Sequence, residues 1–262
     1  MSYETLKFSV AGSVATITLN RPDAANSLNL QMGNDLLAAA NRCTSDPAIR
    51  AVILTAEGRM FCGGGDVGGF AKAENPGELL RGITTGLHAA IARFQRMDAP
   101  LVIAVNGVAA GAGMSIAASG DFVLAAESAK FTMAYTGIGL SPDGSSTWFL
   151  PRLVGPMKAK ALMMRNPLLT AADALELGLV SEVVADDELM NAATALATEL
   201  AAGPTRAYGE VKRLVAASLD SSLDAQMERE TRAIAELANT TEDARAGITA
   251  FVAKEKPEFN GR

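Results

Sequence analysis

The alternation of apolar and polar residues predicts strands and helices that follow one another along most of the chain. Val14 to Leu19 alternates between apolar side chains and threonines, which is typical of a half-buried strand. Ala51 to Thr55 and Leu101 to Val105 are continuous apolar runs, each followed by a glycine-rich loop, and indicate buried strands. Further strands are expected at residues 121–125 and 179–184.

Apolar residues at helical spacing predict helices between these strands and throughout the last quarter of the chain. The expected helices cover residues 29–44, 78–97, a short segment from 112, 171–177, and an alanine-rich region from 187 onward. Gly203-Pro204 separates two helices of that region, another begins at Ser221 or Ser222, and the last covers 242–253. Residues 68–78 are expected to form a mobile loop, and 135–153 mostly loop with a short helix. The pattern predicts an α/β fold with an all-helical tail.

Two glycine-rich loops carry the strongest chemical signal. Residues 61–67 read Phe-Cys-Gly-Gly-Gly-Asp-Val, and residues 106–114 contain three glycines after the Leu101 run. Residues without bulky side chains allow two backbones to approach closely. Two N–H groups that converge in this way can stabilise a negative charge that develops on a carbonyl oxygen. The loops therefore predict an enzyme that acts next to a carbonyl group.

Composition narrows the functional class. The chain has 262 residues, 49% of them apolar, a net charge of −6 and a pI near 5.0, which argues against binding to nucleic acid or to an acidic membrane. The N-terminus lacks the pattern of a signal peptide, and glycines interrupt the longest apolar region, so a cytoplasmic protein without a membrane span is expected. Two cysteines and one histidine provide neither a disulfide framework, nor a zinc cluster, nor a readable Ser-His-Asp triad.

Several motifs in fixed order resemble the crotonase superfamily, also called the enoyl-CoA hydratase/isomerase family. The resemblance covers nearly the whole chain and comes closest to the single-aspartate isomerases. Its carriers are Asn20-Arg21-Pro22, Asn26-Ser27-Leu28, both glycine loops, Asp121, Ala129-Lys130-Phe131, Gly139 to Gly144, Leu175 to Val180 and Phe251 to Lys254.

The resemblance implies a spiral of repeated ββα units over residues 1–200, which would hold an acyl-CoA site. Residues 201–262 would form a C-terminal helical region that assembles the protein into a trimer or a dimer of trimers. The substrate would be an acyl-CoA thioester, and no cofactor is expected because coenzyme A enters with the substrate. By position, the backbone N–H groups of Gly65 and Ala112 would hold the thioester oxygen.

The same resemblance suggests where coenzyme A binds. The candidates are Arg21, Ala24, Ala25, Asp66, Val67, Phe251 and Lys254, the last two often acting from a neighbouring chain. A solvent-exposed tail lysine is an equally good interpretation of Lys254. Gly68 replaces a basic residue of many relatives, which leaves one phosphate contact in doubt.

Hydratases of this family carry glutamates at the positions of Ser115 and Tyr135, so the usual hydration chemistry is disfavoured. Asp143 matches the single catalytic acid of some isomerases that act on ring-derived acyl-CoA, and also the nucleophile of aroyl-CoA dehalogenases. Proton transfer between two carbons needs only one base. The alternative for Asp143 is a helix cap within common turn chemistry.

The expected acyl pocket comprises Tyr135, His88, Ser115, Met114 and Trp148. His88 matches in position the histidine that activates water in the dehalogenases, although an ordinary surface histidine is the simpler interpretation. Ser115 could line the pocket or bond its own helix backbone. The sequence therefore favours an enoyl-CoA isomerase. Hydratase-like chemistry, a hydrolytic or dehalogenating enzyme, and a non-catalytic acyl-CoA binder remain as alternatives.

Overall fold

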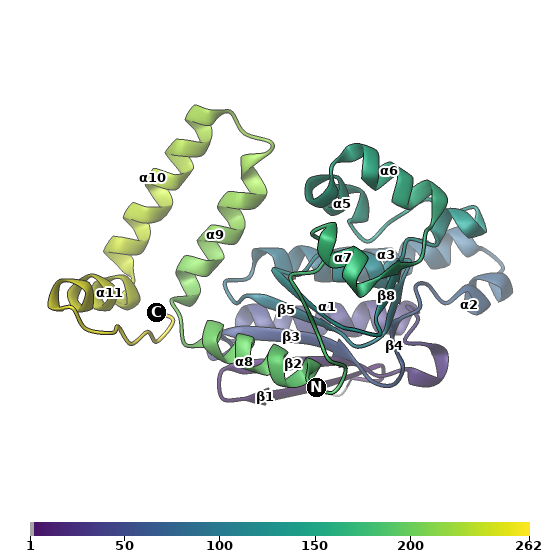
Figure 1. Ribbon diagram of the computed structural model, residues 1–262, viewed down its shortest axis with the longest axis horizontal. Helices are drawn as coiled ribbons and strands as arrows, with labels where there is room; N and C mark the ends of the chain where they lie inside the picture. The colour runs from purple at the N-terminus through teal and green to yellow at the C-terminus, as the bar shows by residue number, and fades with distance from the viewer. Residues whose placement is uncertain (1–2) are drawn as a thin grey trace.

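Two sheets and the helices packed around them form the body of the molecule in the computed structural model, which describes residues 3–262 (Figure 1). The larger sheet has the order β1-β2-β3-β5-β7-β10, and the smaller sheet has the order β4-β6-β8-β9. Only the β1–β2 and β8–β9 pairs are antiparallel among these strands. The strands span Leu6–Ala11 (β1), Val14–Leu19 (β2), Ala51–Ala56 (β3), Met60–Cys62 (β4), Leu101–Val105 (β5), Val108–Ala110 (β6), Phe122–Ala126 (β7), Lys130–Thr132 (β8), Leu169–Thr170 (β9) and Glu182–Val184 (β10).

From β3 to β8, successive strands alternate between the two sheets. Strands β3, β5 and β7 enter the larger sheet, and the strand that follows each of them, β4, β6 or β8, enters the smaller one. This regular alternation confirms the predicted spiral of ββα units. Apart from the antiparallel β1–β2 pair, the larger sheet is parallel, and its central strands β3 and β5 are buried along their whole length.

Helices α1 (Leu30–Ser45) and α3 (Pro76–Arg96) pack together beside the sheet, close to their predicted bounds. Their N-termini begin where asparagine side chains accept hydrogen bonds from free backbone N–H groups. Asn29 accepts from Met32 at 2.9 Å, and Asn75 accepts from Glu78 at 3.2 Å. Helix α8 (Leu189–Ala201) contacts β3, β5 and β7.

The structure corrects the prediction for residues 68–78. Helix α2 (Val67–Lys72) occupies the first half of this segment, which was expected to be a loop. The cause is local, because the Asp66 carboxylate caps the helix by accepting a hydrogen bond from the Gly69 N–H at 3.1 Å. The sequence also did not predict α6 (Pro156–Arg165).

Short elements connect the sheets on the side of the glycine loops. The first loop lies close to the 3₁₀ turn η1, and the second runs into a helix. These elements are η1 (Pro22–Ala24), α4 (Ala112–Ala117), the 3₁₀ turn η2 (Tyr135–Ile138), α5 (Ser146–Val154) and α7 (Ala171–Glu176). Thr170 and Asp173 form a capping box at the start of α7, a helix that the sequence predicts over residues 171–177.

The last three helices form an arm that extends from the body (Figure 1). They are α9 (Thr205–Ser218), α10 (Leu223–Thr240) and α11 (Glu242–Ala253), with Ser222 as the N-cap of α10. Lys212 fixes α9 to the body, since its ammonium group contacts the Asp121 carboxylate at 2.7 Å and the Phe94 carbonyl at 2.8 Å. None of the helices within residues 3–262 combines the length and apolar character required to cross a bilayer.

Candidate active site

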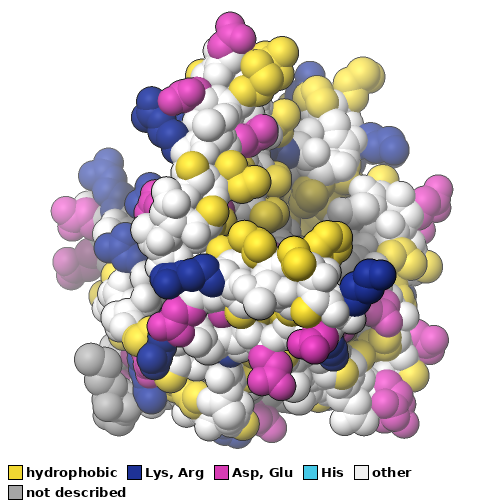
Figure 2. All heavy atoms as spheres, turned by 90° about the vertical axis from the view of Figure 1, so that its left-hand side faces the viewer, with side chains coloured by type: hydrophobic (Ala, Val, Ile, Leu, Met, Phe, Trp, Pro, Cys, Tyr) yellow, Lys and Arg dark blue, Asp and Glu magenta, His cyan; other side chains and the backbone are white. Residues whose placement is uncertain are grey.

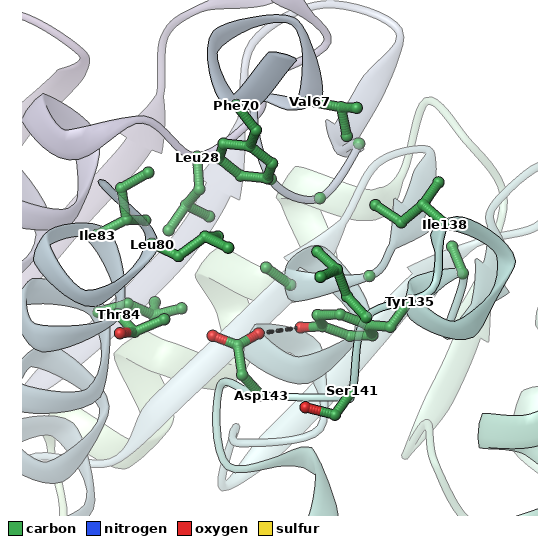
Figure 3. A pocket seen from close by; sticks show the side chains of 18 residues that line it. Leu28, Val67, Phe70, Leu80, Ile83, Thr84, Tyr135, Ile138, Ser141 and Asp143 are labelled. Carbon is green, nitrogen blue, oxygen red and sulfur yellow. Dashed lines mark hydrogen bonds between the residues drawn. The ribbon is translucent and has the colours of Figure 1, made fainter. Parts of the chain in front are cut away.

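A cavity of about 310 Å³ lies between both glycine loops, helix α3 and the segment from Ala134 to Asp143 (Figure 3). Its walls are mostly apolar, with side chains that include Leu28, Phe70 and Ile83. Tyr135, Asp143, Thr84 and Ser141 bring polar groups to it. An enclosed apolar space with a few convergent polar groups is typical of a small-molecule site.

The two glycine loops meet backbone to backbone at this cavity. A Cβ atom added to Gly64 would lie 3.2 Å from the Ala110 carbonyl oxygen, and one added to Gly111 would lie 3.4 Å from the Gly64 Cα. Both residues also have positive φ angles, +102° and +51°. Glycine adopts such angles at little cost and leaves room for the approach. The sequence therefore places glycine where the two loops touch.

The N–H groups of Gly65 and Ala112 are not used by the secondary structure. The Leu28 N–H donates to the Gly64 carbonyl at 2.7 Å, and the Leu28 carbonyl accepts from the Asp66 N–H at 2.9 Å. Because these two bonds use the groups on one side of the first loop, the Gly65 N–H points to the other side. Ala112 is the first residue of α4, where an N–H has no partner within the helix. Within residues 3–262 neither N–H has a hydrogen-bond acceptor. Both residues line the cavity.

Asp143 lies at the end of a chain of hydroxyl groups. The Tyr135 hydroxyl donates to Asp143 Oδ1 at 2.5 Å and lies 3.0 Å from the Ser115 hydroxyl (Figure 3). Ser115 Oγ also lies within hydrogen-bond distance of the Gly111 carbonyl, at 3.2 Å. Burial raises the pKa of Tyr135, and the neighbouring Asp143 charge raises it further. Tyr135 therefore remains a neutral donor toward the carboxylate.

The Asp143 carboxylate does not cap a helix, in contrast to the alternative that the sequence left open. Helix α5 begins at Ser146, and the Ser146 N–H donates to the main-chain oxygen of Asp143 at 3.2 Å. The side-chain oxygens of Asp143 instead contact Tyr135 and His88. The carboxylate is free to act in the cavity that it lines.

His88 lies on the side of Asp143 that faces away from the glycine loops. Its Nε2 accepts a hydrogen bond from the Gly144 N–H at 3.1 Å and lies 3.4 Å from Asp143 Oδ2. The His88 side chain is 49% exposed and lines a separate, open cleft rather than the cavity. His88 stands one helical turn beyond Thr84 on α3, which carries it past the wall that Asp143 forms.

The expected acyl pocket needs correction in four of its five residues. Tyr135 lines the cavity, whereas His88 and Trp148 line the open cleft. Ser115 and Met114 lie on α4, and all residues of this helix are buried. The side chains of Ser115 and Met114 therefore lie behind the cavity wall. Ser115 combines both of its predicted roles in part, because it contacts its own backbone and also Tyr135.

Most side chains that line the cavity were not identified from the sequence. Phe70 is the clearest case, since it lies on α2 and covers Gly65 so closely that a Cβ added there would fall 2.6 Å from the ring. Leu80 and Ile83 recur at helical spacing on α3 and both line the cavity. No sequence signal distinguishes Thr84, Ile138, Leu140 or Ser141 as lining residues.

Five of the seven coenzyme A candidates lie around the first glycine loop. Arg21 forms an ion pair with Asp66 at 3.1 Å, and the Ala25 carbonyl accepts from the Gly63 N–H at 2.8 Å. Ala24 ends η1, and Val67 lines the cavity. The other two, Phe251 and Lys254, are exposed at the end of α11, on the arm and away from this loop (Figure 1).

Comparison with known proteins agrees with this geometry. Residues 9–262 match the enoyl-CoA hydratase/isomerase family. The chain is 40% identical to a Rhodobacter capsulatus protein named probable enoyl-CoA hydratase, with 100% of both chains covered. It is 38% identical to the 1,2-epoxyphenylacetyl-CoA isomerase of Escherichia coli, with 97% of both chains covered.

A solved structure extends the similarity to the fold. The crystal structure of an enoyl-CoA hydratase from Polaromonas superposes with a TM-score of 0.91 at 31% identity and covers 97% of this chain and 99% of that one. The fold, the two glycine loops and a match over nearly the full length agree, and the chain belongs to the enoyl-CoA hydratase/isomerase family.

Proposed function

We propose that this protein is an enoyl-CoA isomerase that uses Asp143 as its single acid and base. The observation that carries the proposal is that Asp143 is the one carboxylic acid among the described residues lining the cavity, which also contains the free N–H groups of Gly65 and Ala112. A base beside two unused donors fits a substrate whose carbonyl oxygen becomes negatively charged.

In the proposed reaction the thioester oxygen accepts hydrogen bonds from Gly65 and Ala112. The Asp143 carboxylate removes a proton from the carbon next to the carbonyl, and the electron pair delocalises as the double bond shifts and the oxygen becomes negative. The resulting Asp143 carboxylic acid then returns a proton two carbons away, at the γ carbon. The double bond moves from the β,γ to the α,β position, and Asp143 is again ionised.

Hydration is disfavoured because it requires two carboxylates, which position one water molecule and deliver its oxygen and its proton to adjacent carbons. Ser115 and Tyr135 occupy the two hydratase positions, and they form the hydroxyl chain to Asp143 instead. The Escherichia coli relative bears an isomerase name, whereas the Rhodobacter relative bears a hydratase name. The donor set of the cavity favours the isomerase.

A hydrolytic or dehalogenating reaction is the second candidate, supported by the 3.4 Å contact between His88 and Asp143. In that route Asp143 attacks the halogen-bearing aryl carbon and the halide leaves, and His88 then activates water to cleave the resulting ester. The position of His88 outside the cavity weighs against it. A His88→Ala enzyme incubated with a halogenated aroyl-CoA would accumulate an ester on Asp143 in this route, and mass spectrometry would detect it.

The substitution Asp143→Asn tests the isomerase proposal. Turnover of a β,γ-enoyl-CoA should fall by about 10²- to 10⁴-fold, since loss of a general base has effects of this size. Binding of the same thioester, measured by calorimetry, should persist because the cavity keeps its shape. Turnover equal to wild type would refute the role of Asp143. Thioester binding by wild type without product from any enoyl-CoA would instead identify a non-catalytic binder.

We further propose that the nucleotide end of coenzyme A lies along Arg21, Ala24, Ala25, Asp66 and Val67, and that Phe251 and Lys254 reach it from another copy of the chain. Residues 201–262 would then be the assembly region of a homotrimer or a dimer of trimers, and residues 1–200 the catalytic core. The cytoplasm is the proposed location, supported by two cysteines that are buried and unpaired.

A further inference from the structure

A second cleft, here called the outer cleft, shares Asp143 with the cavity. An open cleft of about 950 Å³ is lined by residues from α3, α9 and the start of α5, with His88, Ala92 and Trp148 among them. Asp143 lines this outer cleft as well as the cavity. The proposed base therefore forms part of the wall between the substrate space and a second space open to solvent.

The two oxygens of the Asp143 carboxylate have different partners. Oδ1 accepts the hydrogen bond from Tyr135, which is partly buried and keeps its proton. Oδ2 lies 3.4 Å from His88 Nε2, and His88 is half exposed in the outer cleft. A proton on Oδ2 thus lies next to a solvent-exposed base, whereas the Oδ1 side leads only to buried hydroxyl groups.

The hydrogen bond from Gly144 selects one tautomer of the neutral His88 ring. A backbone N–H can only donate, so Nε2 must offer its lone pair, and the neutral ring carries its proton on Nδ1. Two acceptors then face each other while Asp143 is ionised. When Asp143 has taken a proton on Oδ2, the same contact becomes one between a donor and an acceptor.

We propose, building on the isomerase function, that His88 exchanges the proton on Asp143 with solvent between its removal from one carbon and its return to another. The proton passes from Asp143 Oδ2 to the lone pair of His88 Nε2, which gives up its hydrogen bond from the Gly144 N–H, and this leaves a carboxylate and an imidazolium. The imidazolium releases this proton to water in the outer cleft and regains the neutral form that accepts from Gly144. The reverse steps place a solvent proton on Asp143, which delivers it to the γ carbon.

The test measures the isotope of the transferred proton. Wild type converts an unlabelled β,γ-enoyl-CoA in D₂O, the reaction is stopped early, and mass spectrometry with NMR gives the deuterium at the γ carbon of the product. Substantial deuterium is expected. Direct return of the substrate proton by Asp143 would give an unlabelled γ carbon and would overturn the proposal.

The informative variant is His88→Gln. Its amide oxygen can still accept from the Gly144 N–H, but its side chain cannot carry the proton. Deuterium per turnover should fall severalfold, whatever happens to the rate. Ala92→Leu narrows the outer cleft one helical turn from His88 and should also lower the deuterium per turnover. Ala202→Leu is the control, since Ala202 is exposed at the C-cap of α8 and lies outside the outer cleft, and it should leave the deuterium per turnover unchanged. An unchanged deuterium fraction in His88→Gln would contradict the proposal, because His88 would then serve only to accept the hydrogen bond from the Gly144 N–H.

A second substrate separates this proposal from the proposed function. Phenylacetyl-CoA has acidic α protons but no double bond that the enzyme could move. Exchange of its α protons in D₂O therefore requires Asp143 and access to solvent, and it involves no isomerisation. If wild type isomerises no enoyl-CoA, the proposed function fails. The role of His88 is then decided by this α-proton exchange. The exchange should be slower in His88→Gln than in wild type, and an equal rate in the two proteins would contradict the proposal.

Discussion

At the scale of single residues, the site combines one charged group with neutral donors. Asp143 accepts from Tyr135, Tyr135 contacts Ser115, and Ser115 contacts the Gly111 carbonyl beside the cavity. Hydroxyl groups thus lie at Ser115 and Tyr135, where the family resemblance implies the carboxylates of hydratases. They provide orientation for Asp143 without adding a second base.

The hydrogen bond from Tyr135 should matter for turnover. Bonds to charged groups contribute about 1.5–3 kcal/mol, and each 1.36 kcal/mol is a factor of about ten in rate. Tyr135→Phe is expected to lower kcat/KM for a β,γ-enoyl-CoA by roughly 10- to 100-fold. Tyr3→Phe is the matched control, because the buried Tyr3 hydroxyl has no hydrogen-bond partner among residues 3–262. Equal rates in both variants would refute the orienting role of Tyr135.

The sequence allowed prediction of those site residues that depend on the backbone path. The glycine loops themselves indicate a close approach of two backbones, and Gly64 and Gly111 meet in this way. Gly65, Ala112 and Asp143 were assigned by their match to the family motifs, and their roles stay predictions. Phe70 and Thr84 could not be found in this way, because which side of a helix faces the cavity depends on how α2 and α3 pack. The same packing carries His88 past the cavity wall, so its sequence position alone was misleading.

At the scale of elements, the crossing of α1 and α3 positions the helical wall of the cavity. The two helices touch through Gly33 and Gly86, where a Cβ added to Gly86 would lie 2.7 Å from the Gly33 carbonyl carbon. Helix α3 carries Ile83, Thr84 and Leu87 to the cavity. A close contact between backbones therefore sets the width of the site.

A pair of glycine substitutions on α3 tests this contact. Gly86→Ala should destabilise the protein by about 1–3 kcal/mol, since the added methyl group meets backbone that cannot yield. Gly82→Ala is the control on the same helix, where the methyl group meets only the end of the Leu30 side chain at 3.1 Å. Alanine there should be neutral or stabilising by up to about 1 kcal/mol. Equal urea-unfolding midpoints for the two variants would contradict the account.

Element prediction failed where local side-chain bonds outweighed composition. Helix α2 was expected to be a loop because its sequence holds two glycines, yet the Asp66 cap begins a helix there. The buried strands β2, β3, β5 and β7 and the long helices were predicted, since their apolar spacing reflects burial directly, whereas β1 was not predicted. The assignment of each second strand to the smaller sheet came only from the family resemblance, because β4, β6 and β8 are too short for a clear pattern.

At the scale of the whole molecule, the arm exposes more apolar surface than a single chain needs. Phe251 is 84% exposed and Val252 is 78% exposed at the end of α11, with Ile248 and Ile234 nearby on the arm. Figure 2 shows apolar side chains gathered over a hollow on the face that carries α10 and α11. Such patches are typical of surfaces that bind another protein.

Light scattering after gel filtration tests the proposed assembly. Wild type should have three or six times the chain mass of 27.1 kDa. Phe251→Glu should shift the population toward smaller species, because a charge would enter an apolar interface. Met157→Glu is the matched control, since Met157 is 81% exposed but lies on α6, outside the arm. A wild-type protein that elutes as a monomer would contradict the proposed trimer.

The central claim is that the N–H groups of Gly65 and Ala112 hold the thioester oxygen opposite Asp143. The most direct measurement is the infrared stretching frequency of the thioester carbonyl in a bound, unreactive acyl-CoA. The account predicts a lower frequency on wild type than in water. It predicts that Ala112→Pro, which removes one N–H at a helix position that suits proline, loses much of this shift. A bound carbonyl that vibrates as it does in water, or equally in both proteins, would contradict the claim.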